Sequence, residues 1–356
     1  MRPLQKKDLK QLALWFDKNQ RDFPWRKEQA RPYRVWIAEI MSQQTQMAAL
    51  VPYFQRFMTR FPTIQHLAAA EEAEVLTAWA GLGYYSRARN VHRAAKMISE
   101  NFGENFPQTY LQWLELPGVG PYTAAAVVSQ CFGGEEPVWD GNVVRVLSRL
   151  FARKDAHAPG FRAEFLPLLK SAMHGLSASA VNQGLMELGA TVCTPKNPRC
   201  GKCIFSDRCS AYAQSAAADY PPPKKRKEFV DLKCQAWIRV RKGTASSEVY
   251  LERREQGQWY EGLWDFPSDL GGNRAPKKTG LHQASGQSVG VVRHAITCHR
   301  IQLEGFVLRE KVVKVKPKAN SGWFTLDALC SDQTPVPLST IAKKLLRTWL
   351  RHIKEL

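Results

Sequence analysis

Residues 116–123 read LPGVGPYT and separate two stretches in which apolar residues recur every three or four positions, as they do in helices. Gly118 and Gly120 carry no side chains, so the backbone of this turn can approach another surface closely. Pro121 suits the first turn of the helix that follows. The free amide groups at that helix start can bind a phosphate oxygen, aided by the helix dipole. The stretch therefore indicates two helices joined by a hairpin that could grip a phosphate, although a simple tight turn has the same pattern.

The segment around this hairpin has the pattern of one helical domain. From Leu4 to about residue 210, short turns containing Gly or Pro separate helical stretches, and no β-rich segment intervenes. We therefore expect an all-α domain over residues 1–213. Residues 214–228 are small, polar and proline-rich, which is typical of a linker. Its basic run KKRK at 224–227 fits either a solvated linker that approaches phosphate or a nuclear localisation signal.

The part of the chain after the linker has strand patterns. Residues 234–240 and 248–252 alternate between apolar and polar side chains, and residues 341–353 have the pattern of a closing helix. We therefore expect a second domain, of mixed α/β class, over residues 229–356.

The overall charge of the chain indicates a polyanionic partner. The 356 residues carry a formal net charge of +19, and 44% of them are hydrophobic, enough for packed cores. Phosphate backbones are the commonest intracellular polyanions, although a merely basic protein is the alternative. Residues 1–10 do not resemble a secretory signal, and no apolar run approaches the length of a membrane span. We therefore expect a cytoplasmic protein.

Four cysteines lie close together in the sequence at Cys193, Cys200, Cys203 and Cys209. Disulfides are unusual inside cells, so this clustering indicates a metal site. Zinc usually draws on two separated Cys-x2-Cys pairs, whereas this segment has one such pair flanked by two longer steps. The spacing favours an iron–sulfur cluster and leaves zinc open. The other cysteines are scattered and suit ordinary apolar positions.

Two acidic residues are candidates for catalysis. Glu39 falls on a largely apolar helix face, where loss of solvent should raise its pKa and let it hold a proton. The alternative is a buried glutamate satisfied by backbone donors. Asp140 lies between Trp139 and Gly141 at a helix start, so it could instead be a simple N-cap.

Together these features resemble the MutY family of helix-hairpin-helix DNA glycosylases, in the endonuclease III superfamily. The resemblance covers about residues 8–210. Its further motifs are RDFPWR at 21–26, AEIMSQQTQ at 38–46, GLGYY at 81–85, DGNV at 140–143 and Asn182-Gln183. The family usually has leucine where Ser42 stands, so packing against the base differs here.

The resemblance implies a base-excision repair enzyme that hydrolyses the N-glycosidic bond of adenine opposite 8-oxoguanine, and also opposite guanine, after the base is flipped out. Glu39 would protonate adenine, and Asp140 would stabilise the electron-poor sugar, with Asn142 in the same motif. Bifunctional relatives have a lysine that forms a Schiff base where this chain has Tyr122. A monofunctional glycosylase follows, in which Tyr122 positions Glu39 or the sugar.

The resemblance also assigns a cofactor and binding residues. A structural [4Fe–4S] cluster would be held by the four cysteines. The partner would be double-stranded DNA. The protein would bind it as a monomer, without an obligate protein partner, in the nucleoid of a bacterium. The adenine pocket would be lined by Arg21, Trp25, Arg26 and Gln183. DNA would be contacted by Gln44, Tyr84, Leu116, Gly118 and Gly120. For Gln44 and Tyr84, ordinary loop packing is the alternative.

The second domain resembles the MutT-like (Nudix) domain of the same family, through LERR at 251–254 and GLWDFP at 262–267. Between residues 268 and 290 the only acidic residue is Asp269, so nucleotide hydrolysis is not expected. Thr297 would help to recognise 8-oxoguanine. Two alternatives stay open, an endonuclease III-like lyase acting on oxidised pyrimidines and a non-catalytic iron–sulfur protein that binds DNA.

Overall fold

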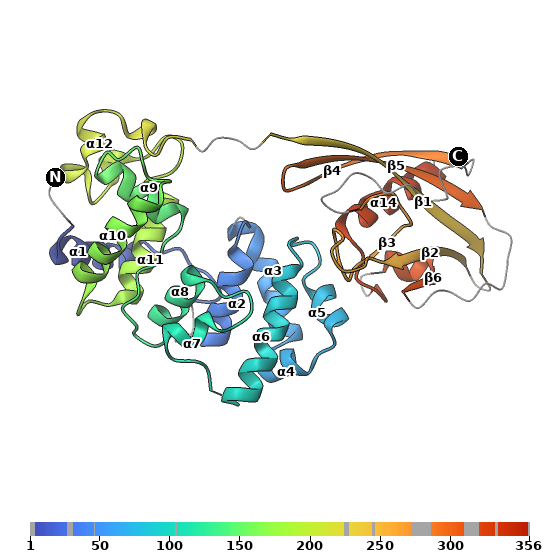
Figure 1. Cartoon of the computed structure of the whole chain (residues 1–356), viewed down its shortest axis with the longest axis horizontal. Coiled ribbons are helices and arrows are strands. Elements are labelled where there is room, and N and C mark those ends of the chain that lie inside the picture. The colour runs from blue at the N-terminus through green and yellow to red at the C-terminus, as the bar shows by residue number, and fades with distance from the viewer. Residues whose placement is uncertain are drawn as a thin grey trace. The chain divides into compact units, whose positions relative to one another are not determined.

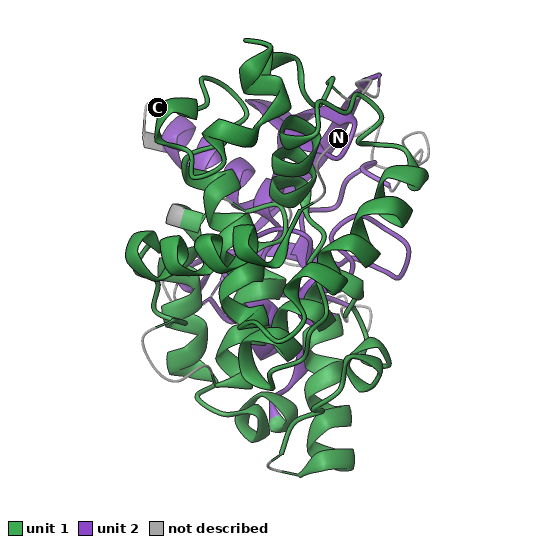
Figure 2. Ribbon diagram, turned by 90° about the vertical axis from the view of Figure 1, so that its left-hand side faces the viewer, with its two compact units in different colours: residues 1–69, 90–225 green, residues 70–89, 226–356 purple. Residues whose placement is uncertain are grey.

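The computed structural model describes residues 4–26, 31–45, 47–103, 105–223, 228–243, 246–271, 286–309, 320–331 and 334–354. The chain divides into two compact units, which Figure 2 shows in different colours. The first comprises Met1–Ala69 and Asn90–Lys225, and the second comprises Ala70–Arg89 and Arg226–Leu356. The segment Ala70–Arg89 thus groups with the second unit, although its sequence pattern places it in the helical domain. The basic run at 224–227 lies outside the described residues.

Helices build the first unit (Figure 1). Its described part contains no strand, which confirms the predicted all-α domain. The helices that belong to this unit or enter it are α1 (Lys6–Asn19), α2 (Pro32–Ser42), α3 (Met47–Arg60), α4 (Ile64–Ala69), α6 (Ser86–Phe102), α7 (Tyr110–Leu114), α8 (Pro121–Cys131), α9 (Gly141–Leu150), α10 (Pro159–Met173), α11 (Ala178–Thr191) and α12 (Ser210–Ala213). The short α5 (Glu72–Ala78) lies in the second unit.

Helix α8 is central to the first unit. Every residue from Thr123 to Ser129 is buried, and the helix packs against α2, α7 and α11. Small side chains at 124–126 allow this close packing, while the longer polar residues Tyr122 and Gln130 stand at the two ends. The helix therefore acts as a rigid support for side chains at its termini.

The predicted hairpin joins α7 to α8. Gly118 has a φ of +76°, and a Cβ atom added there would lie 2.6 Å from Cβ of Asn90, so only glycine fits. Gly120 is the N-cap of α8, and a Cβ atom there would meet open space. Leu116 is only 5% exposed, and its carbonyl accepts a hydrogen bond from the Val119 amide. The Leu116 side chain thus belongs to the core, and the open surface of the turn is backbone.

The second unit is built on a mixed sheet that has six strands among its described residues (Figure 1). The strands run in the order β3-β2-β1-β5-β4, with β6 paired to β2 and with β1 and β5 parallel. Its elements are β1 (Val230–Lys242), β2 (Ser247–Arg253), β3 (Trp264–Asp265), β4 (Gln287–Ile296), β5 (His299–Arg309), β6 (Ser321–Thr325), α13 (Leu326–Cys330) and α14 (Thr340–Lys354). These elements confirm the predicted strands, the closing helix and the α/β class. Leu345 and Trp349 of α14 pack with Ile238, Leu251 and Leu303 of the sheet.

No helix in the described part of the chain is both long and apolar enough to cross a membrane.

Candidate active site

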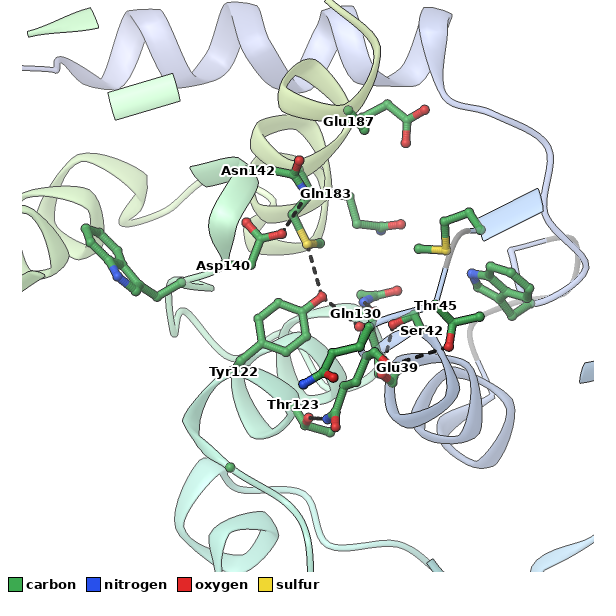
Figure 3. Close-up of a pocket in the computed structure, with 18 of the residues that line it drawn as sticks. Glu39, Ser42, Thr45, Tyr122, Thr123, Gln130, Asp140, Asn142, Gln183 and Glu187 are labelled. Carbon is green, nitrogen blue, oxygen red and sulfur yellow. Dashed lines mark hydrogen bonds between the residues drawn. The ribbon is translucent and has the colours of Figure 1, made fainter. Parts of the chain in front are cut away.

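A cavity of about 840 Å³ opens in the first unit (Figure 3). It lies between the loop that follows α1, the C-terminal end of α2, the hairpin with α8, the start of α9, and α11. The predicted site residues that line it are Arg21, Trp25, Arg26, Glu39, Gln44, Gly120, Tyr122, Asp140, Asn142 and Gln183. Residues from segments more than a hundred positions apart in the sequence are thus brought to one place.

Glu39 lies on α2 and accepts one side-chain hydrogen bond on each carboxyl oxygen. The Tyr122 hydroxyl lies 2.8 Å from Oε2, and Nε2 of Gln130 lies 3.1 Å from Oε1. Burial raises the pKa of Glu39, and nearby Asp140 raises it further, while the two hydrogen bonds and Arg26 lower it. Both donors are side chains rather than the backbone donors of the alternative interpretation. Glu39 is therefore suited to carry a proton and release it.

Tyr122 occupies the first turn of α8, directly after the hairpin. Its hydroxyl also lies 3.3 Å from Sδ of Met186 on α11. Burial and the two nearby carboxyl groups raise the pKa of Tyr122 well above its ordinary value. The phenol therefore stays protonated and serves as a neutral hydrogen-bond partner of Glu39.

Asp140 is the N-cap of α9 and also lines the cavity. Its Oδ1 accepts from the Val143 amide at 2.8 Å, and its Oδ2 accepts from Nδ2 of Asn142 at 2.7 Å. Burial raises the pKa of Asp140, whereas these donors and Arg145 lower it. The capping and catalytic interpretations therefore do not exclude each other, because the cap orients a carboxylate at the cavity wall.

A network of charges forms another wall of the cavity. Glu187, on α11 and only 1% exposed, lies 2.5 Å from Nε of Arg21 and 3.2 Å from Nη2 of Arg26. Arg26 also donates Nε to Oε1 of Gln183 at 3.1 Å. Trp25 is 7% exposed and stacks on Phe23, so most of its ring packs inside the protein.

Two residues that contact the predicted site residues, Glu187 and Gln130, were not predicted from the sequence. Glu187 follows Gln183 by four positions, and side chains at this spacing share a helix face, so it could have been found. Gln130 contacts Glu39 across 91 positions of sequence, and nothing in its own surroundings signals that contact.

The four cysteines line one small cavity together with Arg149, which is only 2% exposed. Nη1 of Arg149 lies 3.4 Å from Sγ of Cys193, and the Phe205 amide donates to Sγ of Cys203 at 3.4 Å. Within the described ranges, no three His, Cys, Asp or Glu side chains are grouped to hold a single metal ion. A buried cation and amide donors facing sulfur suit an anionic thiolate-bound cluster.

Two other predicted residues, Tyr84 and Thr297, line a pocket of about 400 Å³ in the second unit. Tyr84 is 46% exposed and has a φ of +49°, which fits a side chain presented at a surface. Thr297 lies in the two-residue turn between β4 and β5, and its hydroxyl donates to the Ile296 carbonyl at 2.7 Å.

Comparison with known families gives two matches. Residues 37–169 match the model of the HhH-GPD superfamily of base excision DNA repair proteins. Residues 193–209 match the iron–sulfur binding domain of endonuclease III. The second match spans all four clustered cysteines and confirms the predicted cofactor, a [4Fe–4S] cluster.

Curated relatives and solved structures agree with this result. The adenine DNA glycosylase of Buchnera aphidicola subsp. Schizaphis graminum is 35% identical over 71% of this chain and 72% of its own length. The human adenine DNA glycosylase is 42% identical in a match that covers 56% of this chain and 38% of the human protein. A solved thermostable thymine-DNA glycosylase superposes with a TM-score of 0.54 at 28% identity, over 59% of this chain and 96% of that structure. The chain belongs to the adenine DNA glycosylase family.

Proposed function

We propose that the protein is a monofunctional DNA glycosylase of base excision repair that removes adenine opposite 8-oxoguanine, and also opposite guanine. The observation that carries the proposal is the pair Glu39 and Asp140 on one cavity. Glu39 is hydrogen-bonded to Tyr122, and the two carboxyl oxygens of Asp140 accept hydrogen bonds from Asn142 and Val143. A proton-carrying acid and a second carboxyl group that hydrogen-bond donors orient on the same cavity form the arrangement that N-glycosidic hydrolysis requires.

The reaction divides between the two groups. As the bond from sugar C1′ to adenine N9 breaks, its electron pair leaves with the base, and Glu39 donates a proton to N7. The positive charge that develops on the sugar is stabilised by the Asp140 carboxylate. The oxygen of a water molecule then bonds to C1′, and the proton that it loses passes to a carboxylate of the cavity.

The choice of adenine is supported by the opposite wall. An adenine edge offers an amino donor and ring-nitrogen acceptors. The Glu187 carboxylate and the Gln183 amide, held by Arg21 and Arg26, supply acceptors and donors for that edge. We place the flipped base between this network and Glu39.

Hydrolysis without strand cleavage is supported by the residues of the cavity wall. No lysine is among the described residues that line the cavity, and a Tyr122 phenol cannot form an imine. The family's cluster would be held by the four cysteines as a structural element and supplies no step of the reaction.

We assign recognition of the opposite strand to the pocket lined by Tyr84 and Thr297, and to backbone contacts. Tyr84 would enter the duplex beside 8-oxoguanine, and Thr297 would contact that base. Gln44 would fill the stack, and the hairpin from Leu116 to Gly120 would bind phosphate through its amides. We assign a monomer in the bacterial cytoplasm, and the net charge of +19 supports its association with DNA.

The test is excision from end-labelled duplexes that contain A opposite 8-oxoguanine, A opposite G, A opposite T, T opposite G, or an oxidised pyrimidine. We expect strand breaks in the first two duplexes and only after alkali. High-yield breaks without alkali, or covalent trapping by borohydride, would contradict the monofunctional mechanism. Activity confined to the oxidised pyrimidine would favour the endonuclease III-like alternative.

A further inference from the structure

Glu39 is held by two different kinds of hydrogen-bonding group, both carried by α8. Tyr122 stands at the start of this helix and Gln130 at its end, with a fully buried stretch between them. The hydroxyl bonds to Oε2 and the amide bonds to Oε1 (Figure 3). Both carboxyl oxygens are thus engaged before any base enters the cavity.

The two partners differ in what they allow. A phenol is both donor and acceptor, so it can accept from a protonated Oε2 once its own hydrogen points elsewhere. Sδ of Met186, 3.3 Å from the Tyr122 hydroxyl, offers that second acceptor. The NH2 group of an amide can only donate, so the oxygen that faces it stays an acceptor.

From this asymmetry we infer that Gln130 is a positioning residue for the general acid, holding Oε1 as an acceptor so that the transferable proton is carried by Oε2, on the Tyr122 side. The inference rests on the proposed function, because it assumes that Glu39 donates a proton to the base. It adds a residue that supports catalysis without touching the substrate.

A consequence for the pH range of activity follows. The hydrogen bond from Gln130 stabilises the ionised carboxylate and lowers the pKa of Glu39, against the larger effect of burial. The other titratable or charged groups around Glu39 are Tyr122 and Cys131 on α8, Arg26 in the loop before α2, and Asp140 at the start of α9. All of these remain when Gln130 is replaced.

The experiment measures single-turnover excision of adenine opposite 8-oxoguanine from about pH 5 to pH 9. The variants are Gln130→Leu and Gln130→Met, which both lose the donor, and the control is Gln55→Leu on the exposed surface of α3. We expect the plateau rate to fall about tenfold, because the acid loses its fixed orientation. We also expect the alkaline limb of the profile to move up by about half a unit to one unit, because the charged form loses a donor.

Gln130→Glu provides a second test that does not depend on removing polarity. Two adjacent carboxyl groups cannot both ionise easily, so the alkaline limb should move further upward than in Gln130→Leu. Duplex binding and thermal unfolding verify that each variant is folded.

Four outcomes separate the possibilities. A shifted alkaline limb in the donor-free variants supports the inference. An equal loss of rate at every pH would overturn it, because that is the result of a purely structural defect, and so would a profile identical to that of Gln55→Leu. If the unmodified protein excises no adenine, the proposed function itself fails, which is a distinct result.

Discussion

Arg149 of α9 donates a hydrogen bond to the sulfur of Cys193, with Nη1 3.4 Å from Sγ. The same buried guanidinium bonds to the carbonyls of Thr194, Pro195 and Tyr220. One turn earlier, Arg145 donates to the Cys193 carbonyl and to Oδ1 of Asn142, each at 2.8 Å. The cysteine segment therefore holds the helix that carries Asp140 at its N-terminus.

The first prediction concerns this connection. The purified protein should be brown because of its iron–sulfur cluster, whereas a zinc site would leave it colourless. Arg149→Met should lower the free energy of unfolding by about 3 kcal/mol, because several buried acceptors lose their donor. It should also lower the visible absorbance per protein chain. Thermal unfolding and iron content check both effects against Lys154→Met, an exposed control. Unchanged absorbance and stability would show that Arg149 does not support the cluster.

The second prediction separates catalysis from capping at Asp140. Asparagine is also a good N-cap, so Asp140→Asn should change the melting temperature little. It lacks the negative charge that stabilises the sugar, so excision should fall by at least about a hundredfold while duplex binding persists. Gel-shift and single-turnover assays measure the two properties side by side. An active Asp140→Asn variant would remove Asp140 from its catalytic role.

Glu39 and Asp140 show which features of the site can be predicted from the sequence. Sequence patterns placed Glu39 on a helix and Asp140 at a helix start, and the structure has both residues in these positions. The closing helix near residues 341–353 and the strands near residues 234 and 248 followed from the same periodicity. Local order of this kind depends on neighbouring residues, which the sequence displays directly.

Contacts between distant segments could not be predicted in this way. Gln130 meets Glu39, and Glu187 meets Arg21, across 91 and 166 positions, and each pairing depends on how helices pack. The grouping of Ala70–Arg89 with the second unit is likewise a tertiary feature. Such residues look like ordinary helical polar residues until the packing of α2, α8 and α11 is known.

The third prediction concerns Glu187. Glu187→Gln should leave Arg21 and Arg26 without their shared counter-ion, and the wall that we propose to face adenine should lose its fixed geometry. Single-turnover excision should fall about a hundredfold, since small displacements of positioning groups are costly. The matched control is Glu136→Gln, which removes an exposed ion pair with Lys170 and should change the rate little. Equal rates for the two variants would show that the Glu187 network does not position the base.

The fourth prediction concerns stability and pH at Glu39. The pKa of Glu39 is raised in the folded protein, so between its ordinary value and the raised one the folded state binds a proton that the unfolded state has lost. The free energy of unfolding therefore falls as pH rises through this window, because a buried carboxyl must ionise. Glu39→Gln removes the ionisation and keeps the shape, so it should abolish excision yet raise the melting temperature, with a gain that grows from acidic to alkaline pH. Melting curves of both proteins over the same buffers measure this difference. A gain that is the same at every pH would mean that Glu39 titrates normally, and the general-acid assignment would then lose its physical basis.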